Sequence, residues 1–307
     1  MYTTVDQVYS EPILKAYETR TGIRVKAVYD VEAAKTTGMV ARLEAEKSRP
    51  QADVFWNGEF AQTIGLKEKG VLAPYVSPAT KDIAVEFKDT QGHWAGMGGR
   101  ARIFLVNTQR LKPSEYPSSL DDMLSPKWTA ASIGMANPLF GTTATQAAAL
   151  YATRGAAATQ AFFKALHERG VKVVDGNSVV RDMVASGQLS FGLTDTDDAA
   201  EAIQRGAPVK VIAPDQAKGG TLVIPGTVAL IAGAPHLAEA RALVDYLLSA
   251  DTEVALIRAG GCQTSVRPNS PASDPAFASI KPMSVSLLEV QAMLPRALAE
   301  LREIFMR

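Results

Sequence analysis

Short segments rich in β-branched residues alternate along the chain with longer segments of helical periodicity. In residues 6–21, Val8, Tyr9, Ile13, Leu14 and Tyr17 share one helical face, and Gly22 follows as a C-terminal cap. This alternation of strand and helix predicts parallel α/β units. The predicted strands cover residues 2–5, 23–29, 53–56, 94–97, 103–107, 133–136, 172–174, 189–193, 209–213 and 223–231. The predicted helices cover residues 6–21, 37–48, 60–70, 119–124, 143–154, 157–168, 178–186, 198–205, 236–249, 251–259 and 284–306.

The length of the chain bears on its domain organisation. A chain of 307 residues is long enough for about two domains, each with its own core. The strand at 103–107 follows Gly98-Gly99-Arg100 and is the predicted crossing into a second domain, and Pro225-Gly226 marks the return. We therefore expect two α/β lobes, hinged around a central cleft. The predicted N-terminal lobe is 1–102 plus 227–280, and the predicted C-terminal lobe is 103–226 plus 281–307.

Composition excludes several classes of protein. The 32 Lys and Arg residues balance the 32 Asp and Glu residues, so nothing indicates a nucleic-acid groove or a polybasic membrane patch. No segment reaches the roughly 20 apolar residues of a membrane span. The single cysteine, Cys262, excludes an internal disulfide and a cysteine-rich metal site. Because the first residues already read as a strand, we expect a mature chain without its signal peptide.

Common catalytic motifs are missing from the sequence. It has no GxSxG elbow, no HExxH, no Walker loop and no GxGxxG after a strand. The three histidines, His93, His167 and His236, lie in settings typical of surface or structural residues. A nucleophile without a base is weak evidence for catalysis, so we predict that the chain is not an enzyme. A hydrolase or transferase on the same fold is the least favoured alternative.

The most distinctive feature is the run from Gly192 to Asp198, which places three carboxylates between a predicted strand and a predicted helix. Open α/β sheets bind their ligands at this strand-to-helix edge. The same run also suits helix capping, with Thr196 or Asp197 as the N-cap residue and the acids complementing the helix dipole. From the run alone, capping and ligand binding are about equally favoured.

Polar side chains follow other predicted strands as well, on the side where a cleft would form. Capping is the alternative role for those at helix starts, whereas free N–H groups at helix N-termini bind anions. Acids at one rim and helix N-termini at the other predict a ligand with a cationic or metal part and an anionic part. The candidate residues are Asp6, Trp56, Asn57, Glu59, Phe140, Thr142, Thr143, Asn177, Asp195, Asp197 and Asp198.

Several short segments, taken in their order along the chain, resemble those of a known protein family. They are Tyr2-Thr-Thr-Val-Asp6, Lys15 to Val25, Ala52 to Asn57, Gly99 to Asn107, Gly192 to Asp195 and Ala240 to Ser249. In this order the chain resembles the extracellular family 1 solute-binding proteins of bacterial ABC importers, a branch that includes the ferric-ion-binding proteins. The resemblance implies a type II periplasmic-binding-protein fold, a periplasmic or cell-surface location, and delivery of a captured solute to a permease.

The resemblance also implies a metal-binding set. Asp6 stands where that family has a histidine after the first strand. The family's glutamate matches Glu59, or Gly58 if the spacing shifts by one, and its two adjacent tyrosines fall on Asp197 and Asp198. Loss of the two phenolates weakens the iron interpretation. The remaining carboxylates suit hard cations such as magnesium, calcium, manganese or iron.

A second set of residues matches the family's synergistic-anion site. The positions in this chain that resemble the family's anion-binding residues are Thr142, Thr143 and Asn177. Asp195 lies near another such position, and Arg100 is the expected charge partner. The carboxylates would equally accept hydrogen bonds from an ammonium group or from sugar hydroxyls. In that case the helix N-terminus at Thr142 would hold a phosphate or phosphonate.

We therefore predict a solute-binding protein that captures a metal ion of the iron type, with or without a synergistic anion. An organic solute such as an aminophosphonate, a polyamine or a sugar phosphate is the alternative, with Trp56 and Phe140 as aromatic contacts unless they pack in the core. The predicted metal ligands are Asp6, Glu59, Asp197 and Asp198. The predicted partners are an ABC permease and the ligand. We expect no cofactor beyond a bound metal ion, no nucleic acid, no membrane span and a monomer.

Overall fold

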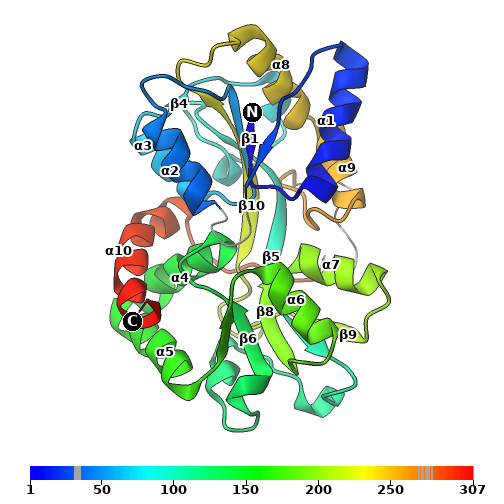
Figure 1. The fold of residues 1–307 in the computed structure, drawn as a ribbon, viewed down its shortest axis with the longest axis vertical. Helices are drawn as coiled ribbons and strands as arrows, with labels where there is room; N and C mark the ends of the chain where they lie inside the picture. The colour runs from blue at the N-terminus through cyan, green and yellow to red at the C-terminus, as the bar shows by residue number, and fades with distance from the viewer. Residues whose placement is uncertain (31–35, 269, 271–272, 274–276, 278, 307) are drawn as a thin grey trace. The chain divides into compact units, whose positions relative to one another are not determined.

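The computed structural model describes residues 1–30, 36–268, 270, 273, 277 and 279–306. The chain divides into two compact units (Figure 1). Unit 1 comprises Met1–Arg100 and Ile224–Ala278, and unit 2 comprises Ala101–Val223 and Ser279–Arg307. The chain thus crosses between the units after residues 100, 223 and 278, where the sequence predicts crossings after 102, 226 and 280. Both units mix helices with a sheet, which confirms the predicted α/β class.

Unit 1 is built on a mixed sheet with the strand order β2-β1-β3-β10, and β4 also pairs with β10. β1 is parallel to β2 and β3, whereas β10 is antiparallel to β3. β1 and β2 are shorter than the sequence predicts, β3 is shifted by one residue from the predicted 53–56, β4 was not predicted, and the bounds of β10 are as predicted. They are β1 (Tyr2–Thr3), β2 (Val28–Tyr29), β3 (Val54–Asn57), β4 (Leu72–Ala73) and β10 (Val223–Ile231).

Among its described residues, unit 1 has five α-helices. α1 ends as predicted, because Gly22 adopts the left-handed conformation (φ 73°) and its N–H donates to the carbonyl of Glu18 at 2.8 Å. Apolar residues of α1, α8 and α9 form one core with Val54 and Trp56 of β3. The helices are α1 (Gln7–Thr21), α2 (Thr37–Ala45), α3 (Ala61–Glu68), α8 (Leu237–Leu247) and α9 (Ala250–Arg258).

Unit 2 has a sheet in which β6 is parallel to β7 and β8, and β5 is antiparallel to β8 and β9. The strands are β5 (Ala95–Asn107), β6 (Ile133–Ala136), β7 (Lys172–Val174), β8 (Phe191–Asp195) and β9 (Val209–Ile212). The bounds of β6 and β7 are as predicted. β8 begins and ends two residues later than the predicted 189–193.

The prediction of two separate strands at 94–97 and 103–107 was wrong, because β5 is continuous through Gly98 and Gly99. Gly98 has φ 62°, a conformation that favours glycine, and a Cβ there would lie 2.3 Å from Sγ of Cys262. The glycine therefore allows the strand to pass close to Cys262 without a break. The prediction treated two adjacent glycines as a strand terminator, which tertiary packing overrides.

Helices cover both faces of the unit 2 sheet (Figure 1). Along β5, Phe104 and Val106 pack with α4, α5 and α10, whereas Ile103 and Leu105 pack with α6 and α7. This is the alternation expected of a strand buried on both faces. The helices are α4 (Gly141–Arg154), α5 (Ala156–Arg169), α6 (Asn177–Ala185), α7 (Thr196–Gln204) and α10 (Leu287–Phe305).

Short 3₁₀ helices complete the structure. They are η2 (Pro78–Thr80), η3 (Val85–Phe87), η4 (Pro113–Glu115), η5 (Leu120–Leu124) and η6 (Ala130–Ser132). The helix predicted at 119–124 is the 3₁₀ helix η5, and at its start Oδ2 of Asp122 accepts from the N–H of Ser119 at 3.0 Å, as in a capping box. Among the described residues, no helix combines the length and the apolar character needed to cross a bilayer.

Candidate functional site

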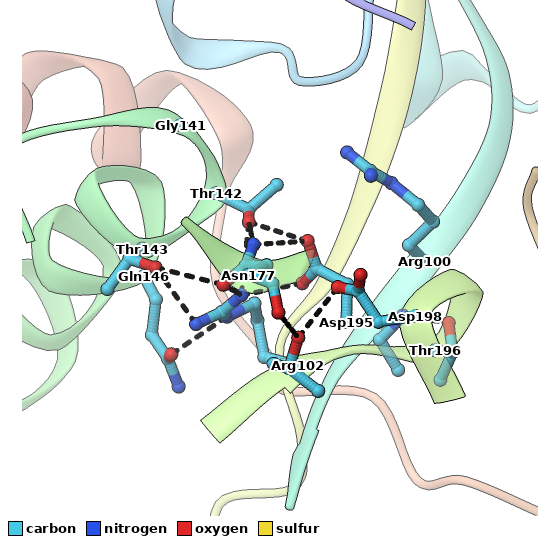
Figure 2. Close-up of polar contacts among 12 residues, drawn as sticks. Arg100, Arg102, Gly141, Thr142, Thr143, Gln146, Asn177, Asp195, Thr196 and Asp198 are labelled. Carbon is cyan, nitrogen blue, oxygen red and sulfur yellow. Dashed lines mark hydrogen bonds and ion pairs between the residues drawn. The ribbon is translucent and has the colours of Figure 1, made fainter. Parts of the chain in front are cut away.

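Polar residues from three strand ends meet in unit 2 (Figure 2). Because β6 lies between β7 and β8 and is parallel to both, the carboxyl ends of these strands share one edge of the sheet. Thr142 follows β6, Asn177 follows β7, and Asp195 ends β8. Oδ2 of Asp195 accepts hydrogen bonds from Oγ1 of Thr142 at 2.6 Å and from Nδ2 of Asn177 at 3.0 Å. Three candidates from distant parts of the sequence thus contact one another.

Arg102 of β5 is the centre of this cluster, and the sequence did not single it out. The antiparallel register of β5 and β8 places Arg102 directly opposite Asp195. Nη1 of Arg102 donates to Oδ1 of Asp195 at 2.7 Å. The two side chains are 0% and 1% exposed. Ions buried to this degree need a close partner and further hydrogen bonds, and this pair has both.

The guanidinium of Arg102 is fixed on its other sides by helices α4 and α6. Nη1 also donates to Oγ1 of Thr142 at 3.0 Å and to Oδ1 of Asn177 at 3.2 Å. Nη2 donates to Oγ1 of Thr143 at 3.1 Å, and Nε donates to Oε1 of Gln146 at 3.0 Å. All three nitrogens of the planar head are therefore hydrogen-bonded, which holds the charge in one position and orientation.

The capping roles considered for this region were wrong. The N-cap residues of α4, α6 and α7 are Phe140, Gly176 and Asp195, and none of them makes a side-chain capping bond. Thr196 accepts instead from the N–H of Ala101 at 3.1 Å. Because each helix begins one or two residues earlier than predicted, the Thr and Asn side chains belong to first turns and face Arg102 or Asp195.

An acidic cluster lies beside this network, formed by Asp195, Asp197 and Asp198. One carboxylate oxygen from each lies within 4.8 Å of the others, and all three residues are buried. Oδ2 of Asp198 accepts from Oγ1 of Thr194 at 2.6 Å, and its Oδ1 lies 3.6 Å from Nη1 of Arg181. Burial, followed by the charges of Asp197 and Asp195, raises the pKa of Asp198 well above its usual value.

Arg181 contacts two other carboxylates besides that of Asp198. Its Nε donates to Oδ1 of Asp182 at 2.8 Å, and its Nη1 pairs with Oε2 of Glu201. One guanidinium is therefore shared among three carboxylates, while Arg102 is engaged with Asp195. The clustered carboxylates are oxygen donors of the kind that suit a hard cation.

The remaining polar candidates lie in unit 1. Oε2 of Glu59 accepts from the N–H of Ala61 at 2.7 Å, and its Oε1 accepts from the N–H of Gln62 at 2.9 Å. This buried carboxylate therefore satisfies the N-terminus of α3. Asp6 is the N-cap residue of α1, without a side-chain capping bond. Asn57 is buried and donates to both Glu59 and Thr63 at 3.0 Å.

Three further candidates have structural contacts. Trp56 is fully buried in the core of unit 1, so packing explains its position. Phe140 packs partly against the unit 2 core at the start of α4. Nη2 of Arg100 donates to the carbonyl of Gly58 at 2.6 Å.

One signal in the sequence points to Arg102. It interrupts the otherwise apolar run Ala101 to Val106 in a strand that is buried on both faces, and a buried arginine requires an anionic partner. What the run does not give is the identity of that partner. Gln146 and Thr194, the other unpredicted members of the network, carry no comparable signal, since single polar residues are common in helices and strands.

Comparisons with known proteins agree with this fold. The chain is 25% identical over 260 residues to Iron uptake protein A1 of Synechocystis sp., covering 81% of this chain and 69% of that protein. The ferric binding protein from Campylobacter jejuni has a similar structure (TM-score 0.87, 19% identity), covering 99% of this chain and 98% of that one. So does the periplasmic binding protein AfuA from Actinobacillus pleuropneumoniae with bound fructose-6-phosphate (TM-score 0.86, 22% identity, 99% and 97% covered).

These solved structures confirm the predicted periplasmic-binding-protein fold. The match at the level of the family extends over most of the chain. Residues 50–285 match the family described as bacterial extracellular solute-binding protein. A match of this extent covers parts of both units, including the acidic cluster and Arg102. The chain therefore belongs to the bacterial extracellular solute-binding protein family.

Proposed function

We propose that the protein is the solute-capturing component of an ABC importer and that its cargo is a metal ion of the iron type. The observation that carries this proposal is the acidic cluster, in which three buried carboxylates approach within 4.8 Å. Like charges at such distances repel one another strongly where water is excluded. A bound cation would remove that repulsion, and carboxylate oxygens are the ligands that hard cations prefer.

Asp197 and Asp198 are the proposed ligands within unit 2. Asp195 is less suited to direct coordination, because Arg102, Thr142 and Asn177 already donate to its carboxylate. The cluster therefore offers two carboxylates for cargo and one that is held in place beside them. Asp6 and Glu59 of unit 1 stay predicted ligands. The capping contacts of Glu59 make it the weaker of these two candidates.

The similarity to Iron uptake protein A1 supports iron as the first cargo to test. Membership of the family supports a periplasmic or cell-surface location and a permease as partner. We also infer that the protein binds and releases its cargo without chemical change. An assay with saturating cargo would then give stoichiometric binding, whereas continued turnover would contradict this inference.

A binding titration tests the metal proposal. Chelator-treated protein is titrated with ferric ion, Mn²⁺, Mg²⁺ and Ca²⁺, with calorimetry and elemental analysis as readouts. We expect one ion bound for each chain. Replacing one charged ligand removes an interaction of about 1.5–3 kcal/mol, so Asp197→Asn and Asp198→Asn should each weaken binding about 10- to 100-fold.

Asp182→Asn is the matched control for these substitutions. Asp182 contacts the same Arg181, but its side chain is 59% exposed and lies outside the acidic cluster. We expect its affinity for the ion to equal that of the unmodified protein. Unchanged ion binding in the double variant Asp197→Asn with Asp198→Asn would refute the proposed ligands.

An organic solute is the second candidate function. Carboxylates stand at 197 and 198 where the resemblance predicts tyrosines, and carboxylates also bind ammonium groups and sugar hydroxyls. The bound fructose-6-phosphate of AfuA is consistent with this alternative. A thermal-shift panel of a polyamine, an aminophosphonate and sugar phosphates distinguishes the two. Stabilisation by one of these compounds in metal-free protein favours the organic solute.

A further inference from the structure

The carboxylate of Asp195 lies in a pocket of hydrogen-bond donors typical of sites for small oxyanions. One oxygen accepts from the guanidinium of Arg102 at 2.7 Å. The other accepts from the hydroxyl of Thr142 at 2.6 Å and from the amide of Asn177 at 3.0 Å. A cation, a hydroxyl and an amide that converge on two oxygens are the donors that bind phosphate or carboxylate ligands. We call Arg102, Thr142 and Asn177 the oxyanion cradle.

The cradle is held in place independently of Asp195. Gln146 and Thr143 fix the Nε and Nη2 atoms of Arg102, and Nδ2 of Asn177 also donates to Thr142 at 2.8 Å. These contacts come from α4 and α6, whereas Asp195 comes from β8. Removal of the carboxylate alone would therefore leave the donors in position around an anion-sized space.

Asp195 occupies the cradle in preference to its usual role at a helix start. It is the N-cap residue of α7, and aspartate at that position ordinarily accepts from its own helix at a gain of stability. Here its side chain makes no such capping bond. The charge and the hydrogen bonds of the cradle therefore hold the side chain more strongly than the helix N-terminus does.

We propose that Asp195 is a built-in anion, which fills the place of an external oxyanion and makes cargo binding independent of phosphate or other small anions. This inference deepens the proposed function, because the filled cradle lies beside the proposed ligands Asp197 and Asp198. The synergistic-anion residues implied by the resemblance, Thr142 and Asn177, are present. Their donors are directed at the protein's own carboxylate, so they do not fit a second anion in the same place.

The first test uses anion binding alone and needs no cargo. Phosphate-free protein is heated in increasing concentrations of phosphate, and then of formate. We expect no specific stabilisation of the unmodified protein. Asp195→Ala empties the cradle, so its melting temperature should rise by about 3 °C once phosphate exceeds its Kd about tenfold. Asp195→Asn also loses the charge but keeps the cradle filled, and we expect no rise.

A response of the unmodified protein equal to that of Asp195→Ala would overturn the proposal, as would a folded Asp195→Ala without any response. Asp198→Ala serves as a further control, because it removes a carboxylate of the same acidic cluster outside the cradle. Its melting temperature should not depend on phosphate. If Asp198→Ala responds as Asp195→Ala does, the anion binds to the acidic cluster in general and the assignment to the cradle is wrong.

The second test measures cargo affinity of the unmodified protein, so it stays decisive if Asp195→Ala does not fold. Ferric ion and Mn²⁺ are titrated in phosphate-free buffer and again with phosphate added. We expect equal affinities. A tenfold or greater loss of affinity in the absence of phosphate would show that an external anion is required. If the protein binds no metal at all, the proposed function fails, and the phosphate response of Asp195→Ala still decides the role of the cradle.

Discussion

Arg102 and Asp195 face each other across the antiparallel strands β5 and β8, with Nη1 and Oδ1 2.7 Å apart. Both side chains are buried, so each ion depends on the other for compensation of its lost hydration. The same contact brings the start of α4 and the start of α6 to the end of β8. The ion pair is therefore both the structural centre of the site and the support of its acidic cluster.

The first prediction concerns the stability of this ion pair. Arg102→Met should lower the free energy of unfolding by about 3–5 kcal/mol, because it leaves the buried carboxylate of Asp195 without a cation. Urea unfolding followed by circular dichroism measures the change. Arg205→Met is the control, since the side chain of Arg205 is 60% exposed, and exposed ion pairs contribute about 0–1 kcal/mol.

The double variant Arg102→Met with Asp195→Leu completes this test. It removes both charges and fills the space with apolar side chains, so we expect it to be more stable than Arg102→Met alone. If the single and the double variant lose equal free energy of unfolding, the destabilisation of Arg102→Met comes from poor packing and not from the unpaired carboxylate.

The second prediction concerns pH. The folded state raises the pKa of Asp198 above its ordinary value of 3.8, chiefly through burial and the charges of Asp197 and Asp195. Between the two pKa values the folded chain keeps a proton that the unfolded chain releases. The stability of the metal-free protein should therefore fall as pH rises through this window, by about 1.4 kcal/mol for each pH unit.

Asp198→Asn isolates this effect, because it removes the titrating group and keeps an oxygen that can accept from Thr194. Its stability should exceed that of the unmodified protein by an amount that grows above about pH 4 and then levels off at the folded pKa. Unfolding curves measured at matched pH values provide the comparison. A constant difference from about pH 4 to about pH 8 would contradict the raised pKa.

The third prediction concerns Glu59. Because its carboxylate accepts from two N–H groups of α3 and from Asn57, Glu59→Ala should lower stability by about 1–3 kcal/mol without any cargo present. Thermal or urea unfolding of metal-free protein measures the loss. Glu86→Ala, at an exposed position, is the control and should have little effect. Full stability of metal-free Glu59→Ala would rule out the capping role.

The fourth prediction separates core packing from ligand contact at Trp56. Trp56→Ala should lower stability by about 3–5 kcal/mol, since the side chain is fully buried in the core of unit 1. Trp56→Phe should be milder and should leave the affinity for metal ions unchanged. Calorimetric titration of Trp56→Phe measures that affinity. A tenfold loss in a variant that is still folded would place Trp56 in contact with the cargo.

Much of the fold could be predicted from local pattern. The bounds of β6, β7 and β10 and the end of α1 at Gly22 agree with the prediction, because hydrophobic periodicity and a C-capping glycine are local properties. Errors occurred where non-local contacts decide the outcome. Gly98 lies within β5 with Cys262 packed against it, and the sequence around residue 98 carries no information about residue 262.

The sequence by itself determined that Thr142, Asn177 and Asp195 follow successive predicted strands, since the alternation of strands with helices follows from local pattern. It did not determine what these side chains contact. Only the tertiary structure placed Arg102 opposite Asp195, because their pairing depends on the register of two strands 93 residues apart in sequence. The register of β5 and β8 follows from the packing of both faces of the sheet. The register in turn decides that Asp195 is the partner of the buried Arg102.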